Sequence, residues 1–106
     1  MYQLTKDPIE FPKLHCWGHL YRTSYLDGNL AIVAGHQCTI GKLSVNLDDE
    51  LAGDLAENEF FVKLYGEGDY LNGPAWLTGL FEQAGKVFTT PTSLPGCFFR
   101  RWRLKT

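Results

Sequence analysis

Hydrophobic and polar residues alternate along much of this chain with the two-residue period of a half-buried β-strand. The first such segment, residues 20–26, is rich in aromatic and β-branched residues, and residues 29–34 follow as a second. The Asp-Gly pair at 27–28 favours a two-residue type I′ turn, because both central residues of that turn need positive φ. We therefore predict a β-hairpin in which Leu26 faces Asn29.

This turn fixes which side chains share a face of the hairpin. One face has Tyr21, Thr23 and Tyr25 against Leu30, Ile32 and Ala34, and the other has Leu20, Arg22 and Ser24 against Ala31, Val33 and Gly35. We expect the first face to be the core, because it offers aromatic and aliphatic cross-strand pairs. The same register, extended, places His19 opposite His36.

Three or four further segments have strand patterns. Residues 39–47 alternate with Leu43, Val45 and Leu47 on one side and predict a third strand. Residues 59–65 favour a fourth strand, with a helix as the alternative. Residues 86–90 and 97–104 predict two more, and in the last Phe98, Arg100, Trp102 and Leu104 share one face.

One segment has the period of a helix. Trp76, Leu77, Leu80, Phe81 and Ala84 form one apolar stripe. Pro74 suits the first helical position, and Gly85 suits the end. The predicted fold is therefore α+β, an antiparallel sheet of about five or six strands with one main helix, about residues 74–84, packed on one face. We expect a single domain over 1–106, with 1–14 as an extended N-terminal arm.

Composition places this domain among ordinary globular proteins. The chain has 106 residues, of which 44% are hydrophobic, enough for one core. It has neither a long apolar run nor the apolar segment of a secretory signal, so we expect no membrane span and no signal peptide. Cys16, Cys38 and Cys97 are odd in number and irregularly spaced, which predicts free thiols in a reducing compartment, the cytoplasm.

Acidic residues are concentrated between positions 48 and 69, where eight of them accompany a single base, Lys63. These acids are Asp48, Asp49, Glu50, Asp54, Glu57, Glu59, Glu67 and Asp69. Carboxylates on a rigid domain can imitate a phosphate backbone and occupy the basic groove of a nucleic-acid-binding protein. Acids also simply keep a domain soluble. We take the eight acids as candidate contacts with a protein partner.

Three histidines and a cysteine raise the alternative of a metal site. His15, His19, His36 and Cys38 together offer three imidazoles and a thiolate, which suit zinc. Their spacing matches no common zinc motif, so we predict no metal and no other cofactor. A small metal-binding protein or hydrolase that uses His19, His36 and Cys38 remains the alternative.

No residues in the chain have the pattern of a catalytic centre. Cys38 could pair with His19 or His36 as a nucleophile, but no orienting group or oxyanion hole is indicated. Residues 66–69 contain two glycines but place acids where a phosphate-binding loop needs a lysine. We therefore predict a protein that is not an enzyme.

The C-terminal strand suggests a further alternative. Arg100, Arg101, Trp102 and Arg103 combine bases with an aromatic ring, as in modules that bind single-stranded nucleic acid. On a strand, however, Trp102 falls on the core face, and the arginines can pair with the acidic segment. Direct binding of nucleic acid is therefore kept only as an alternative.

Several segments together resemble a family of small proteins of unknown function from bacteria, phages and plasmids. The resemblance rests on residues 27–32 (Asp-Gly-Asn-Leu-Ala-Ile), 43–47 (Leu-Ser-Val-Asn-Leu), 57–63 (Glu-Asn-Glu-Phe-Phe-Val-Lys), Leu80 and Gly85. It covers the chain from about Tyr21 to Gly85 and leaves both ends uninterpreted. It implies a small α+β domain of mobile genetic elements and identifies no catalytic residues.

Small acidic proteins of such elements often bind and block a host protein. With the acidic segment, this resemblance predicts a non-enzymatic binding protein that inhibits a host defence complex in the manner of an anti-CRISPR protein. The expected partner is a host protein, such as a nucleic-acid-binding defence complex, in the cytoplasm of a bacterial cell. No membrane partner is expected.

Overall fold

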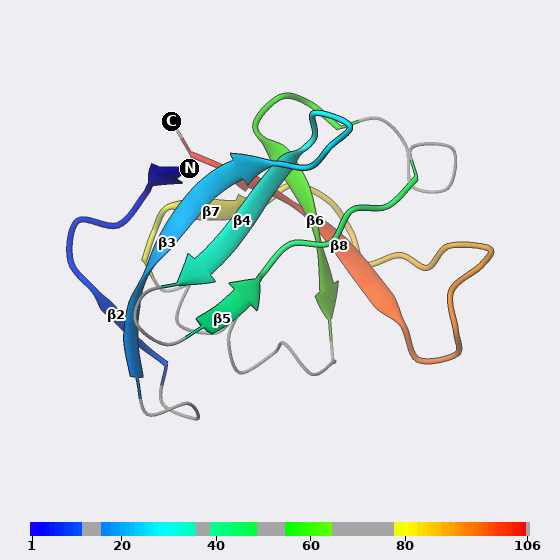
Figure 1. Ribbon diagram of the computed structural model, residues 1–106. Helices are drawn as coiled ribbons and strands as arrows, with labels where there is room; N and C mark the ends of the chain where they lie inside the picture. Colours follow the sequence, from blue (N-terminus) through cyan, green and yellow to red (C-terminus); the bar gives the residue numbers. More distant parts are fainter. Residues whose placement is uncertain (12–15, 36–38, 49–54, 65–77, 106) are drawn as a thin grey trace.

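The computed structural model describes residues 1–11, 16–35, 39–48, 55–64 and 78–105, and these form two antiparallel β-sheets (Figure 1). The first sheet contains β1 (Tyr2–Gln3), β2 (Ile9–Phe11), β3 (Cys16–Ser24), β4 (Leu30–Gly35) and β5 (Thr39–Lys42). The second contains β6 (Glu59–Leu64), β7 (Phe81–Gln83) and β8 (Phe98–Leu104). The strand orders are β1-β3-β4-β5, with β2 also paired to β3, and β6-β8-β7.

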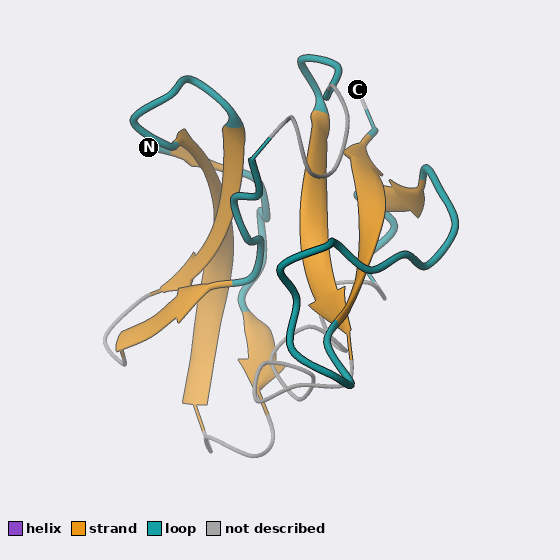
Figure 2. Cartoon of the chain, turned by 90° about the vertical axis from the view of Figure 1, so that its right-hand side faces the viewer, coloured by secondary structure: helices purple, strands orange, loops and turns teal. Residues whose placement is uncertain are grey.

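The two sheets pack face to face, as the two layers in Figure 2 show. Alternate residues of β3, β4, β6 and β8 point into the space between the layers, because the side-chain period of a strand is two. The core cluster consists of Phe11, Leu20, Leu30, Ile32, Ala34, Leu43, Phe60, Val62, Phe81, Trp102 and Leu104. Phe60 and Phe81 meet edge to face inside it, with ring centroids 5.5 Å apart.

The predicted α+β class is wrong for the part of the chain that the structure describes, which contains strands and no helix. Of the predicted helix over 74–84, residues 74–77 lie outside the described part, and residues 81–83 form β7. Gly79 has φ of 79°, which a right-handed helix does not allow. Phe81 pairs with Leu104 of β8, so sheet pairing prevails over the local helical period. No membrane-spanning helix is found among the described residues.

The β3–β4 hairpin forms as predicted, but its register differs by one residue. Ser24 pairs with Leu30, and Tyr25 donates its backbone N–H to the Asn29 carbonyl at 2.9 Å. The loop therefore has three residues, 26–28, and Gly28 takes the left-handed conformation at φ of 91°. A three-residue loop with glycine in this position is a common alternative to the type I′ turn.

This shift moves one whole set of β3 side chains to the opposite face. Leu20, Arg22 and Ser24 now share the inner face with Ala34, Ile32 and Leu30 of β4. Leu20 and Ile32 are fully buried. Tyr21, Thr23 and Tyr25, which the sequence assigned to the core, lie on the outer face. The predicted inner face of β4 is correct: Leu30, Ile32 and Ala34 are all buried.

The other strand predictions have mixed outcomes. The strand at 59–65 is confirmed as β6 and the one at 97–104 as β8, with Trp102 and Leu104 buried as expected. Residues 39–47 begin as β5, after which Val45 forms an isolated bridge to Phe61 of β6. Residues 86–90 are not a strand; Phe88 forms a single bridge to β8.

The N-terminal residues are paired to one edge of β3. β1 pairs with the C-terminal half of β3 and β2 with the N-terminal half. Between them, the Leu4 backbone N–H donates to the Leu20 carbonyl at 2.7 Å, and the Leu20 N–H donates to Thr5 Oγ1 at 3.1 Å. The Thr5 side chain thus takes the place of a ladder carbonyl, and Phe11 extends into the core.

On the outer face of the second sheet, ion pairs join all three strands. The Glu59 side chain is 8% exposed and lies 3.2 Å from Arg103 and 3.8 Å from Arg101, and Arg103 also reaches Glu82 at 3.2 Å. Glu59 also accepts the Ala56 backbone N–H at 2.9 Å. Burial alone would raise the pKa of Glu59, but this hydrogen bond and the two arginines outweigh it and lower that pKa.

The Gly28→Ala substitution tests the register-setting turn. Nothing lies within 4 Å of the added Cβ, so the cost is purely conformational, and we expect a loss of about 1 kcal/mol in the free energy of unfolding. Urea denaturation followed by tryptophan fluorescence measures it. The matched control is Gly35→Ala, which has equal space but no positive φ and should be close to neutral. Equal destabilisation by both variants would contradict this account of the turn.

The Glu59→Gln substitution tests the ion-pair network. Because the folded pKa of Glu59 lies below its usual value near 4.5, its contribution is complete above that value and is lost as pH falls through the folded pKa. We expect the variant to be less stable than the wild type by about 1.5–3 kcal/mol at neutral pH, since it loses charged hydrogen bonds. The difference should shrink as the solution is acidified, in urea melts taken from about pH 7 down to about pH 3.

The control is Glu10→Gln, which neutralises an exposed carboxylate that makes no hydrogen bond or ion pair within the described residues. It should leave stability nearly unchanged. A Glu59→Gln deficit that is as large in acid as at neutral pH would show that the loss does not come from the charge.

Candidate functional site

The structure brings no metal-binding cluster together among the residues that it describes. Of the four candidate ligands only His19 is described; His15, His36 and Cys38 lie outside the described residues. In the observed register the partner of His19 is Gly35, so the expected pairing of His19 with His36 is wrong by one residue.

Hydrogen bonds hold the His19 ring against the N-terminal segment. Thr5 Oγ1 lies 3.0 Å from His19 Nδ1 and already accepts the Leu20 N–H, so its own hydroxyl hydrogen is available to Nδ1. Gln3 Nε2, which can only donate, lies 3.4 Å from the same nitrogen. Both contacts assign the ring proton to Nε2, by inference from the hydrogen bonds. His19 therefore has a positioning role between β3 and the residues after β1.

The prediction of three free thiols is wrong. Cys16, at the start of β3, is disulfide-bonded, whereas Cys97 is a free, half-buried thiol. The third cysteine of the chain, Cys38, lies outside the described residues. Because stable disulfides are rare in reducing compartments, the cysteines no longer support the expected cytoplasmic location.

The acidic segment is only partly described, and its described members have different environments. Glu59 is buried beneath Arg101 and Arg103, so it is not available to a partner without breaking the ion pairs. Glu57 is exposed at the turn before β6, and Asp48 is exposed. The other five candidates, Asp49, Glu50, Asp54, Glu67 and Asp69, lie outside the described residues.

The Arg-rich strand does not present the surface that base stacking requires. Trp102 is 9% exposed and belongs to the core, while Arg101 and Arg103 lie on the outer face with Glu59 and Glu82. Arg100 lies on the inner face, opposite Val62. The ion pairs that Arg101 and Arg103 form with Glu59, an acid of the acidic segment, thus lie within one molecule.

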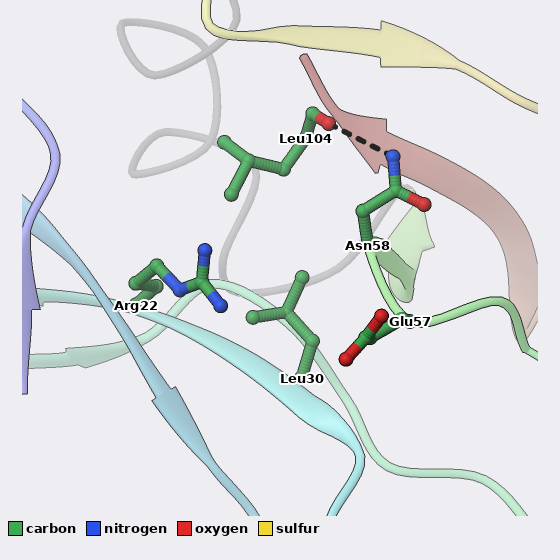
Figure 3. Close-up of a pocket in the computed structure, with 5 residues that line it drawn as sticks. All are labelled: Arg22, Leu30, Glu57, Asn58 and Leu104. Carbon is green, nitrogen blue, oxygen red and sulfur yellow. Dashed lines mark hydrogen bonds between the residues drawn. The ribbon is translucent and has the colours of Figure 1, made fainter. Parts of the chain in front are cut away.

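A pocket opens between the two sheets at the end where β3 leaves the core (Figure 3). Its volume is about 390 Å³, and its described lining residues are Arg22, Leu30, Glu57, Asn58 and Leu104. Arg22 and Leu30 come from the first sheet, and the other three come from the turn before β6 and the end of β8. The two leucines are almost completely buried and form its apolar floor.

A second candidate surface is the outer face of the first sheet. Trp17, His19, Tyr21 and Tyr25 follow one another along β3 and its extension on this face, and we call them the aromatic row. Trp17 is 56% exposed, and the other three rings are half-buried. His19 and Tyr21 meet edge to face, with centroids 6.5 Å apart.

The aromatic row ends in a hollow of about 420 Å³ beside the hairpin loop. Here the Tyr25 hydroxyl hydrogen-bonds to Ser44 at 2.7 Å, and Lys42 Nζ lies 5.1 Å from the centre of the Tyr25 ring. Partial burial of its ring raises the pKa of Tyr25, despite the hydrogen bond with Ser44. The ring is thus held in one position, as a contact surface requires.

The wall of this hollow is also held by hydrogen bonds. Asn46 donates to Asp27 at 2.8 Å, and the Asn29 backbone N–H donates to the same carboxylate at 3.0 Å. These two hydrogen bonds lower the pKa of Asp27. Leu26, next to Asp27 in the loop, is completely exposed and extends the apolar surface beyond the strand.

The sequence reasoning did not identify Arg22 or the aromatic row as candidates. The signal was present in the alternation over residues 17–25, in which aromatic rings occupy odd positions and Leu20 and Arg22 even ones. Assigning the two sets to faces required the length of the hairpin loop, which the Asp-Gly pair alone does not determine.

Comparison with known proteins returns no relative: no family model, no curated protein and no solved structure matches this chain.

Proposed function

We propose that this protein is a non-enzymatic binding domain that recognises a protein partner through the aromatic row on the outer face of the first sheet. The observation that supports the proposal is the exposure of Trp17, at 56%, in line with the half-buried rings of His19, Tyr21 and Tyr25. Tryptophan and tyrosine are enriched at protein interfaces and provide most of the binding energy there.

The geometry suits a docking surface for a physical reason. A sheet that packs one face on a core usually presents polar residues on its other face. Here that face has Trp17, Tyr21 and Tyr25, together with half-buried Val33. Such rings provide large, rigid contact area and lose little conformational freedom on binding. Leu26 at the hairpin tip enlarges this apolar area.

The class of partner is proposed from the sequence. The acidic segment and the resemblance to proteins of mobile elements support a host protein of bacterial origin, such as a basic, nucleic-acid-binding defence complex that this protein inhibits. Exposed Glu57 is a described acid of this segment that lies on the surface, where such a partner could reach it. The acids would then steer association, while the aromatic row would supply the contact energy.

The test is affinity capture from a whole-cell extract of a bacterial host, with the wild type and the double variant Trp17→Ser/Tyr21→Ser as bait. Once the wild type has identified a partner, calorimetry with both purified proteins should give affinity at least about tenfold weaker for the double variant, as expected for two central aromatic contacts. Fluorescence anisotropy with single-stranded DNA should show no binding, since Trp102 is buried.

The matched control is Leu94→Ser, which removes a 74% exposed hydrophobic side chain from a loop outside the aromatic row. It should bind the partner as the wild type does. A partner that binds the double variant and the wild type equally well would refute the aromatic row as the docking surface. Binding of DNA that the double variant loses would assign this surface to nucleic acid instead.

A further inference from the structure

The pocket between the sheets is lined by a charged side chain, Arg22, that forms no ion pair with a described residue. Arg22 lies on the inner face of β3, two residues after Leu20, and pairs with Ile32. Both of these neighbours are completely buried, whereas Arg22 is exposed where the sheets separate. Among the described residues, the Arg22 side chain makes no hydrogen bond and no ion pair. A guanidinium offers paired N–H donors that match a carboxylate, so an unpaired one at an apolar rim can take that group from a ligand.

The opposite wall of the pocket is preformed. Asn58 Nδ2 donates to the Leu104 carbonyl at 3.1 Å, and the Leu104 N–H donates to the Asn58 carbonyl at 2.8 Å. The turn that contains Asn58 is closed by two further hydrogen bonds between Ala56 and Glu59. The backbone at Glu57, inside this turn, is therefore fixed before any ligand arrives.

The two charged groups of the pocket are separated by its floor. Figure 3 shows the Arg22 guanidinium and the Glu57 carboxylate on either side of the Leu30 side chain. No ion pair joins them, and Glu57 makes no other hydrogen bond or ion pair in the described part of the chain. The pocket thus presents a positive group, an apolar patch and a negative group in sequence.

We infer that this pocket binds a carboxylate of the amino-acid class, either as a free amino acid or as the last residue of a polypeptide. The carboxylate would lie on Arg22, the aliphatic side chain on Leu30 and Leu104, and the ammonium or amide N–H on Glu57. Both sources share this chemistry. The inference does not depend on the proposed function, because the pocket and the aromatic row use opposite faces of β3.

Physical chemistry favours this ligand over a simple anion or cation. Arginine offers two parallel N–H groups that match a carboxylate, which lysine does not. A nearby carboxylate such as Glu57 would repel a plain dianion but attract an N–H or ammonium group. A volume of about 390 Å³ lies within the range of small-ligand pockets, and the apolar floor accepts an aliphatic side chain.

The experiment is a titration of the ¹⁵N-labelled full chain, followed by amide NMR shifts, with three probes: L-leucine, N-acetyl-leucine and N-acetyl-leucinamide. We expect shifts around residues 22, 30, 57 and 104 with the two carboxylates, and at least about tenfold weaker binding of the amide.

The Arg22→Gln variant should bind N-acetyl-leucine at least about tenfold more weakly than the wild type, and Arg22→Lys should restore only part of the affinity. Glu57→Gln should weaken leucine more than N-acetyl-leucine, since only leucine has an ammonium group.

The control variant Lys42→Gln removes a positive charge from the outer face and should bind all probes as the wild type does. The same spectra report whether each variant is folded. Tighter binding of leucine would identify a free amino acid as the ligand, and tighter binding of N-acetyl-leucine a chain terminus. If neither carboxylate binds the wild type at up to about 10 mM, or if Arg22→Gln binds equally well, the inference is wrong.

Discussion

The pairing of β3 with β4 in one register is the constraint on which the rest of the molecule depends. It sends Leu20 and Ile32 into the space between the sheets and leaves Arg22 where that space opens. It also turns Trp17 and Tyr21 outward. Because the side-chain period of a strand is two, a slip of one residue would bury the tyrosines and expose the leucine. The core, the pocket and the aromatic row are therefore three consequences of one loop length.

The second sheet completes the core from a different part of the chain. β6 and β8 supply Phe60, Val62 and Trp102, which are buried against the first sheet, while their outer faces are joined by ion pairs around Glu59. The loop before β8 covers part of that outer face, where the rings of Phe88 and Phe99 meet. Much of the outer face of the second sheet is thus occupied by contacts within the molecule. The outer face of the first sheet, with the aromatic row, stays accessible.

Strands with clear alternation were predictable, and their long-range pairing was not. The pattern of β8 gives both the element and the core positions Trp102 and Leu104, whereas in β6 Phe60 and Phe61 are both buried and alternation selects no face. The apolar period that predicted a helix includes Phe81, whose conformation is determined instead by its pairing with Leu104 of β8. Short apolar segments support either period, and tertiary contacts decide between them. The pocket around Arg22 joins residues that are distant in sequence, so no local pattern predicts it.

The division of one edge of β3 between two short N-terminal strands has a consequence for contacts between molecules. β3 spans nine residues, a long row of backbone donors and acceptors. β1 and β2 occupy most of that row, and the Thr5 hydroxyl satisfies the Leu20 N–H between them. An open edge of this length is a template for strands of other molecules. The first eleven residues thus cover this edge, and a chain trimmed there would expose it to pairing with strands of other molecules.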